Sequence, residues 1–388
     1  MEIIRNNKGI ETIIFAKTLD PVAYDQIKTL ANSEAYSDSK IRIMPDAHAG
    51  MGCTIGTTMT ISDKITPNLV GVDIGCGVLT IKLKNKNINF EKLDKTIRAK
   101  VPNGFSVHKR AINSFDFSNL RCQNQMDIER AMLSIGSLGG GNHFIEMGKS
   151  EDNEIYLTIH SGSRKLGNDV CRYYQQLAIK QTSDAKGGSS DLMQKQEGKT
   201  SKKEKLPKLS RDERDLAYLE GSDFDDYLND MAIVQKYASF NRENIAKIII
   251  EEMGFSELER FETIHNYIDF NRMILRKGAV SAELGEKLII PINMRDGSLL
   301  CVGKGNENWN YSAPHGAGRL LSRTQAKKQI DMQDFQKSMK NIFTSSVSRK
   351  TLDEAPQAYK TLDEIKSSIT ETADLIAIIK PVYNFKAP

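Results

Sequence analysis

Residues 311–323 have the sequence YSAPHGAGRLLSR, which surrounds His315 with groups suited to chemistry. Glycine occupies two of the three positions after the histidine, and glycines let a backbone come close to a bound group. Arg319 and Arg323 lie on the same stretch and indicate that the bound group is anionic. From the residues alone, three roles stay open for His315: metal ligand, proton carrier or covalent nucleophile.

A carboxylate and a thiol lie close together in VGVDIGCG, as Asp73 and Cys76. The stretch begins like a buried strand and ends in glycines, so both side chains can enter one pocket. A lone cysteine in such a place is more often a core residue. A buried carboxylate beside it is costly unless it pairs with a cation, so the two residues together indicate a metal site.

Three histidines lie in similar surroundings. His143 follows GGGN, His160 ends the apolar run IYLTIH, and His265 stands in TIHNYID. Each alone is more often structural, but with Asp73 and Cys76 they supply the nitrogen, oxygen and sulfur ligands of a divalent metal. Thiolate and imidazole favour zinc, whereas the aspartate widens the choice toward manganese. Five ligands exceed the four of a closed tetrahedral zinc site, which leaves two metals or a variable site open.

Glycine-rich or basic loops adjoin these candidates and could hold an anion. Backbone N–H groups of LGGGNH, residues 138–143, can form an anion-binding nest with Asn142 as a further donor. The loops SGSR, RKGA and HGAGR add the basic side chains of Arg164, Arg276, Lys277 and Arg319. No Walker A sequence is present, so a nucleotide would be bound by another scheme.

The pattern of apolar residues predicts the elements that position these groups. Strands are expected at 11–17, 155–160, 288–294 and 298–303, with short buried strands between glycines over 41–90. Helices are expected at 21–32, 167–181, 223–254, about 332–342 and 361–374, and residues 378–388 are expected to be extended. Gly254 is a suitable C-cap for the longest of these helices.

Residues 182–210 differ in composition from the rest of the chain. They are poor in hydrophobic residues and carry six lysines between residues 195 and 208, so we expect an exposed Lys-rich insertion loop. A solvated loop without a role and a basic arm near a nucleic acid both fit. No linker divides the chain, and the candidate residues span most of it, so one domain over residues 1–388 is expected.

The bulk composition limits the class of protein. A net charge of +4 leans weakly toward a polyanionic partner. No run of 18 apolar residues or signal peptide is visible, so no membrane association is expected. Five unevenly spaced cysteines do not suggest a disulfide framework, which favours the cytoplasm.

Taken together, the motifs resemble the RtcB family of RNA ligases. They are MPDAHAGMGCTIG, VGVDIGCG, GGGNHFIE, HSGSR, IHNY, RKGA, HGAGRLLSR and DEAPQAYK, followed by a lysine two residues before the C-terminus. They appear in the family's order and run from residue 41 to 386. The resemblance implies an α+β fold, a single domain with a central β-sandwich-like mixed sheet core surrounded by helices.

The resemblance also implies an activity. The family joins an RNA 3′-phosphate or 2′,3′-cyclic phosphate to a 5′-hydroxyl, in RNA repair or tRNA splicing, and uses GTP and manganese. By the family match, His315 becomes covalently linked to GMP. The implied ligands of one or two Mn²⁺ ions are Asp73, Cys76, His143, His160 and His265. The implied nucleotide contacts are Asn142, Glu146, Asn293, Ser298, His315, Gly316, Ala317, Gly318, Tyr359 and Lys386.

The chain departs from the family in its nucleotide loop. The family commonly has IPGSMG there, whereas this chain has IPINMRDG, with Ile292 and Asn293 in place of glycine and serine. Preference for GTP is therefore an open expectation. His48 falls in MPDAHAG, and a structural hydrogen-bonding role is expected for it. Two alternatives to the ligase are a metal-dependent cyclic-phosphate hydrolase or phosphoesterase without covalent nucleotide, and a non-catalytic RNA-binding protein.

Overall fold

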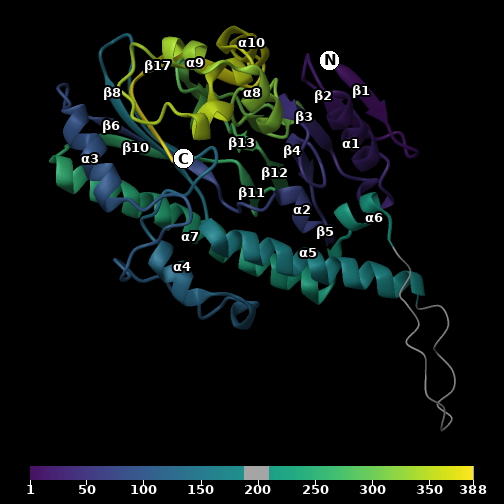
Figure 1. Cartoon of the computed structure of the whole chain (residues 1–388). Coiled ribbons are helices and arrows are strands. Elements are labelled where there is room, and N and C mark those ends of the chain that lie inside the picture. The colour runs from purple at the N-terminus through teal and green to yellow at the C-terminus, as the bar shows by residue number, and fades with distance from the viewer. Residues whose placement is uncertain (188–208, 388) are drawn as a thin grey trace.

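Two large β-sheets with helices on either side form the centre of the computed structural model, which describes residues 1–187 and 209–387 (Figure 1). In spatial order, the six-stranded sheet consists of β1 (Glu2–Arg5), β2 (Glu11–Ile14), β3 (Ile41–His48), β4 (Ile55–Thr60), β12 (Ile274–Lys277) and β11 (Asn266–Asp269). Only β2 and β3 are parallel among these pairs of described strands. The sheet is therefore mixed.

The seven-stranded sheet joins distant parts of the chain. In spatial order it consists of β10 (Glu257–Ile264), β6 (Gly77–Leu83), β8 (Ile155–Ser161), β7 (Phe144–Lys149), β17 (Ala373–Lys386), β15 (Gly297–Gly303) and β14 (Lys287–Asn293). The C-terminal strand β17 pairs with both β7 and β15, so it lies inside the sheet. Two small pairs complete the described strands: β13 (Ala279–Ser281) with β16 (Ser312–Pro314), and β5 (Lys64–Ile65) with β9 (Leu219–Glu220).

Two long helices, α5 (Arg164–Gly187) and α7 (Ser222–Met253), run along one side of the sheets, and the short C-terminal helices gather on the other side (Figure 1). The other helices are α1 (Pro21–Ala31), α2 (Pro67–Val70), α3 (Phe90–Lys100), α4 (Ile128–Ser134), α6 (Arg211–Asp215), α8 (Arg323–Gln329), α9 (Met332–Ser338) and α10 (Leu362–Ser368). Short 3₁₀ turns lie at η1 (Glu34–Tyr36), η2 (Gln123–Gln125), η3 (Glu307–Trp309), η4 (Arg349–Glu354) and η5 (Pro356–Ala358).

Apolar side chains fill the space between the long helices and the sheets. The largest buried cluster includes Ile43 of β3, Val170 of α5 and Val234 of α7. A second cluster joins Ile81 of β6 to Ile249 of α7. These contacts hold the strand ends that carry the candidate site against rigid helices. The α+β class with helices around a sheet core is thus confirmed.

Most predicted elements are confirmed, and their ends follow local chemistry. Asp20 caps α1 by accepting from the Ala23 N–H, and Pro21 occupies the first turn. Gly254 adopts the left-handed conformation after α7, as expected of a C-cap. None of the helices in the described part of the chain is long and apolar enough to cross a bilayer.

Three predicted boundaries are wrong. The insertion does not begin at residue 182, because α5 continues to Gly187. Thr182 and Ser183 lie within the helix, where their hydroxyls donate to the carbonyls of Ala178 and Ile179, each at 2.9 Å. Residues 188–208 of the predicted loop lie outside the described residues.

The helix predicted over 361–374 also ends early, at Ser368. The reason is tertiary: Ala373 already pairs with Gly303 at the start of β17. The neighbouring helix predicted at about 332–342 ends at Ser338 in the structure. Strand pairing by residues that look helical in isolation overrides their local preference.

Candidate active site

Strand pairing brings the expected metal ligands together. Cys76 immediately precedes β6, His143 precedes β7, and His160 lies near the end of β8. These strands are neighbours, and His160 pairs with both Val78 and Phe144. His265 stands between β10 and β11, and its N–H donates to the Cys76 carbonyl at 2.9 Å. The four side chains therefore meet at one end of the seven-stranded sheet.

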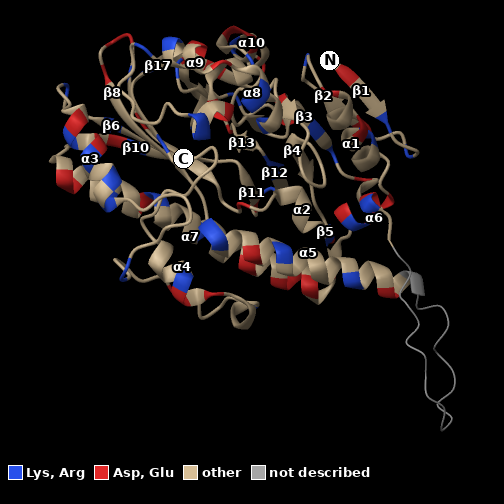
Figure 2. Cartoon of the chain, in the orientation of Figure 1, with Lys and Arg blue, Asp and Glu red and all other residues tan. Residues whose placement is uncertain are grey.

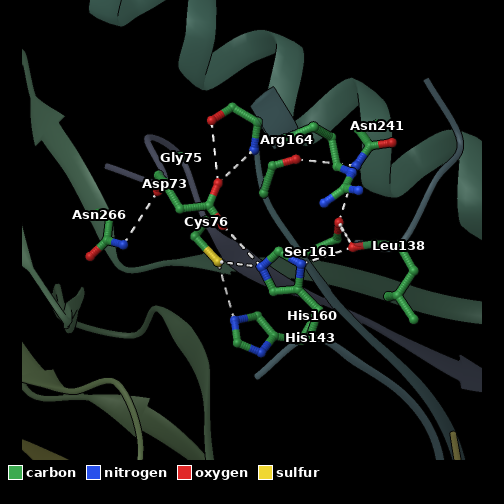
Figure 3. Close-up of polar contacts among 12 residues, drawn as sticks. Asp73, Gly75, Cys76, Leu138, His143, His160, Ser161, Arg164, Asn241 and Asn266 are labelled. Carbon is green, nitrogen blue, oxygen red and sulfur yellow. Dashed lines mark hydrogen bonds and ion pairs between the residues drawn. The ribbon is translucent and has the colours of Figure 1, made fainter. Parts of the chain in front are cut away.

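The donor atoms of the cluster converge on one another (Figure 3). Cys76 Sγ lies 3.4 Å from His143 Nε2 and 3.3 Å from His160 Nε2. His160 Nε2 lies 3.3 Å from His265 Nε2, and Asp73 Oδ2 lies 2.9 Å from His143 Nε2. The atoms form two triads that share Cys76: one with Asp73 and His143, the other with His160 and His265.

Two of the histidines have ring nitrogens that no protein group satisfies. The Nδ1 atoms of His160 and His265 are buried without a hydrogen-bond partner among the described residues. Burial and the neighbouring basic groups hold the pKa of both imidazoles well below the usual range, so both are neutral. Two neutral rings with converging Nε2 lone pairs are the arrangement expected around a cation.

The other triad carries the negative charge. Burial alone would raise the pKa of Asp73, but the hydrogen bond and charge of His143 outweigh it and lower the pKa to about 2. His143 Nδ1–H donates to the Leu138 carbonyl at 2.8 Å, which directs its Nε2 toward Asp73 and Cys76. Burial and the charge of Asp73 raise the pKa of the Cys76 thiol, and a divalent cation would favour its thiolate.

His315 borders this cluster and is oriented by Asp46. Its ring lies 4.9 Å, centroid to centroid, from that of His265. Its Nδ1–H donates to the fully buried Asp46 Oδ2 at 2.6 Å, and the His315 and Gly316 N–H groups donate to the same oxygen at 3.2 Å. With Nδ1 carrying the proton, Nε2 keeps its lone pair and can act as a nucleophile or base.

A cavity of about 820 Å³ opens beside His315. Every residue expected to contact the nucleotide lines it: Asn142, Glu146, Asn293, Ser298, His315, Gly316, Ala317, Gly318, Tyr359 and Lys386. A smaller cavity of about 200 Å³ lies on the other side of the cluster, where Asp73 and Cys76 contribute to the wall. Asn142, His265 and His315 line both cavities, so His315 separates a nucleotide-sized space from a second space.

The loop around His315 needs glycine where it crosses β3. Gly318 has φ +75°, and a Cβ there would lie 2.2 Å from the Asp46 carbonyl oxygen. The HGAGR stretch therefore lies directly against the segment that carries Asp46. This close approach explains why the residue three positions after His315 is glycine.

Glu354 is the centre of a buried polar network in the wall of the large cavity. It accepts hydrogen bonds from Lys386 Nζ, from the Tyr359 hydroxyl at 2.7 Å and from Arg323 Nη1 at 2.7 Å. Burial by itself would raise the pKa of Glu354, but Lys386 and Arg323 lower it to about 2. The carboxylate thus fixes the Tyr359 and Lys386 side chains in the cavity wall.

Glu146 is a second buried carboxyl in the same cavity. Asn384 Nδ2 donates to its Oε2 at 2.9 Å. Burial dominates over this bond and over the charge of Lys386, and it raises the pKa of Glu146 to about 8. The group can therefore exchange a proton close to neutral pH.

Basic residues expected near an anion have mainly structural partners. Arg276 is fully buried, where it pairs with Asp269 at 3.1 Å and donates to Tyr267 and Ser312. Its expected anion-binding role is wrong, because Arg276 lies in β12 and its side chain points into the protein.

The other three cations also bond to protein groups, although they lie closer to the site. Arg319 donates to the Asp353 and Leu321 carbonyls and to Tyr359, so it braces the loop while lining the large cavity. Arg164 donates to the Gly104 carbonyl at 2.7 Å. Lys277 lines the small cavity and donates to the carbonyls of Met51 and Asn68.

Two site residues escaped the sequence analysis, Asp46 and Glu354. Both lie in motifs of the sequence, MPDAHAG and DEAPQAYK, in which only His48 and Tyr359 were predicted to have a role. The available signal was an aspartate inside the apolar run IRIMPDA, because a charged residue in a buried strand needs a partner. His48, in the same stretch, has the expected hydrogen bond, from Nδ1 to the Asp46 carbonyl at 3.0 Å.

Comparison with known proteins adds a family. The model of the family described as "tRNA-splicing ligase RtcB" matches residues 26–126 and 113–387. An RNA-splicing ligase RtcB of Escherichia coli is 30% identical over 408 aligned residues, which cover 93% of this chain and 94% of that protein. A tRNA-splicing ligase RtcB of Nanoarchaeum equitans is 26% identical over 439 residues, covering 88% of this chain and 86% of the relative.

Proposed function

Because the chain belongs to the RtcB family and is an RNA ligase, we propose that it joins RNA 3′-phosphate or 2′,3′-cyclic phosphate ends to 5′-hydroxyl ends through a covalent His315–GMP intermediate. The observation that supports this most directly is the position of His315. Its free Nε2 faces the region where a nucleotide-sized cavity meets the metal-ligand cluster. RNA repair and tRNA splicing are the processes in which such ends occur.

The donor set fits one or two Mn²⁺ ions. Asp73 and His143 with Cys76 would hold one ion, and His160 and His265 with Cys76 the other. The converging Nε2 atoms of the histidines, with the Cys76 sulfur and the Asp73 carboxylate among them, support a bound cation. When bound, such an ion supplies positive charge that neutralises phosphate oxygens and stabilises nucleotidyl transfer.

The side chains around His315 have separable roles in this proposal. Asp46 keeps the proton on Nδ1, so that His315 Nε2 is the atom that attacks the α-phosphorus of GTP. The N–P bond forms as the bond from that phosphorus to the bridging oxygen breaks, and pyrophosphate leaves. Asp46 also favours the imidazolium that forms when a phosphoryl group attaches to the ring. Gly316, Ala317 and Gly318 leave room for a nucleotide against the backbone, and Asn142 can donate to its phosphates from the cavity wall.

Guanine recognition is assigned to Glu146, Tyr359 and Lys386 in the wall of the same cavity. An ionised Glu146 can accept from the N1–H and the amino group of guanine, whereas adenine presents no donor at N1. Tyr359 and Lys386 lie in the same wall, held by Glu354. Asn293 is partly engaged with Asp296 at 2.8 Å, and Ser298 is buried at the start of β15.

The central experiment is covalent labelling. The protein is incubated with Mn²⁺ and GTP labelled at the α-phosphate, and an acid-labile adduct is expected on the wild type but not on His315→Ala. Equal labelling of both proteins, or none of the wild type, would overturn the proposed intermediate. Competition with unlabelled ATP and GTP then measures how far the Ile292–Asn293 loop changes base preference.

The hydrolase alternative gains no support from the comparisons. It would predict phosphate release from a cyclic-phosphate RNA without any covalent labelling by GTP. The non-catalytic alternative expects ligands to be missing, but the chain keeps all five of them in one cluster.

We also propose that residues 1–388 form one catalytic domain in the cytoplasm. Pairing of the C-terminal strand β17 with β7 supports a single domain, since residues near 145 and 385 share one sheet. All five cysteines are free and buried, which suits a reducing compartment. A single cooperative unfolding transition and retention of free thiols in the purified protein would be expected.

A further inference from the structure

Phe105 is the most exposed large hydrophobic side chain in the described part of the chain, with 95% of its surface accessible. It lies in an irregular segment, residues 102–112, that precedes α4 and that we call the Phe105 loop. Exposing a whole aromatic ring to water is unfavourable and indicates a surface that meets a partner.

The Phe105 loop is held in place by hydrogen bonds. The Gly104 N–H donates to the Gly139 carbonyl at 2.9 Å, and Arg164 Nη2 donates to the Gly104 carbonyl at 2.7 Å. Arg130 Nη2 of α4 donates to the Phe105 carbonyl at 2.8 Å. Both residues at the tip are thus anchored through their backbone while the phenyl ring projects outward. A pre-ordered aromatic ring binds with little loss of conformational entropy.

The loop adjoins the metal-ligand cluster. Gly139 has φ +90°, and a Cβ added to it would lie 2.8 Å from His143 Nδ1 and would collide with Arg164 Nη1. Gly139 therefore touches the His143 ring on one side and bonds to Gly104 on the other. The backbone of the Phe105 loop is thus bonded directly to a residue that touches a member of the metal-ligand cluster, which places the loop beside that cluster.

The charge of the loop selects the kind of partner. Lys109 and Arg110 are exposed and form no ion pair with any residue in 1–187 or 209–387. Figure 2 shows basic positions on the segment before α4. An exposed aromatic ring in the same loop as two exposed cations is the combination that single-stranded nucleic acid binds, by base stacking and phosphate neutralisation.

We propose that Phe105 stacks on an unpaired base near the reacting end of the RNA and that Lys109 and Arg110 neutralise phosphates of the same strand. The proposal rests on the RNA ligase activity, but not on GTP or on a covalent intermediate. It assigns strand positioning to a surface outside both cavities. Because every base has a flat face, the contact tolerates any sequence.

The first test measures RNA affinity in Mn²⁺ buffer without GTP, so that no ligation occurs. The probe is a fluorescent single-stranded RNA with a 3′-phosphate, titrated against wild type, Phe105→Ala, Phe105→Trp and Leu284→Ala. Leu284 is a matched control, because it is 82% exposed in a different loop. Phe105→Ala should weaken binding roughly tenfold, whereas Phe105→Trp and Leu284→Ala should bind like the wild type.

Abasic probes localise the contact. An RNA with an abasic nucleotide at one of the last few positions should bind the wild type roughly tenfold more weakly, with no further loss in Phe105→Ala. The chain's one tryptophan, Trp309, is buried at 2% exposure, so new fluorescence in Phe105→Trp reports the loop. RNA should quench that signal.

The second test isolates the cations through salt dependence. Replacing Lys109 and Arg110 together by alanine should reduce the slope of log affinity against log salt by about 1.4, since each phosphate contact on a single strand contributes about 0.7. Thermal melting checks that each variant is folded. Wild-type RNA affinity in Phe105→Ala together with an unchanged salt slope in the double variant would overturn the proposal and point to a protein partner. Failure of GTP labelling alone would leave these affinity results intact.

Discussion

Asp46 determines which nitrogen of His315 carries the proton, although 268 residues lie between them in the chain. Replacing it by asparagine keeps its size but removes the charge that holds the Nδ1 proton and favours an imidazolium. We expect the rate of covalent labelling by GTP in Asp46→Asn to fall roughly 10²- to 10⁴-fold, as when a catalytic histidine loses its orienting carboxylate. Single-turnover labelling measures this. A wild-type rate would show that His315 needs no such partner.

Glu146 gives the nucleotide cavity a pH dependence. Its raised pKa of about 8 means that the carboxyl is neutral below that pH and ionised above it. Only the ionised group accepts two hydrogen bonds from guanine, so KM for GTP in the labelling reaction should fall as pH rises from 6.5 to 8.5. In Glu146→Gln this dependence should vanish, and the preference over ATP should shrink. An identical pH profile for KM in the two proteins would contradict the assignment.

Single residues of the site differ in how far the sequence alone could predict them. The clustering of Asp73 and Cys76 with three histidines could be predicted, because those residue types rarely gather for packing. Asp46 and Glu354 could not be found in the same way, since aspartate and glutamate are common at surfaces. Their importance comes from complete burial, which depends on tertiary structure. Conversely, the sequence predicted that Arg276 binds an anion, but its position in β12 buries the side chain inside the protein.

At the scale of elements, Glu354 connects three segments. It is the last residue of η4, and it forms ion pairs with Arg323 of α8 and with Lys386 of β17. Its lowered pKa, about 2, means that the bonded carboxylate stabilises the fold above the ordinary pKa of 4.5 and that this stability is lost as pH falls toward 2. Glu354→Gln should therefore lower the free energy of unfolding at pH 7 by on the order of 3 kcal/mol.

Urea unfolding at pH 7 and pH 3 tests whether the stabilisation by the Glu354 carboxylate is lost as pH falls. The difference in the free energy of unfolding between wild type and Glu354→Gln should shrink at pH 3. At that pH the carboxyl is protonated in the unfolded chain, with its ordinary pKa of 4.5, so unfolding takes up a proton and the carboxylate contributes less to stability. Glu91→Gln, at an exposed position of α3, is the control and should have little effect at either pH. An equal difference at both pH values would show that packing, not charge, connects these elements.

Elements with strong periodicity, α1 and α7, could be predicted, and so could Gly254 as the C-cap of α7. The errors fall where tertiary contacts decide. Residues 369–374 resemble the end of a helix, yet Ala373 completes a strand pair with Gly303. The polar residues after Gln181 resemble a loop, yet their hydroxyls bond back to the preceding helical turn. In both cases composition alone does not reveal the hydrogen-bond partner.

For the whole molecule, the metal-ligand cluster is the point where distant parts of the chain meet. Its residues come from before β6, before β7, from β8 and from the β10–β11 junction. A cation bound by these residues therefore stabilises the folded chain over the unfolded one. At a free Mn²⁺ concentration 100 times the dissociation constant, the gain is about 2.7 kcal/mol, and the melting temperature should rise accordingly.

Cys76 belongs to both triads, so its loss should affect both ions. We expect Cys76→Ala to abolish the rise in melting temperature with Mn²⁺ and to leave less than one equivalent of bound manganese after gel filtration, as measured by metal analysis. Cys301→Ala is the matched control, because Cys301 is equally buried but lies in β15 and lines neither cavity. It should lower the basal melting temperature through lost packing and keep the full Mn²⁺ response. A full response in Cys76→Ala would mean that the thiol is a core residue and that the cation binds elsewhere.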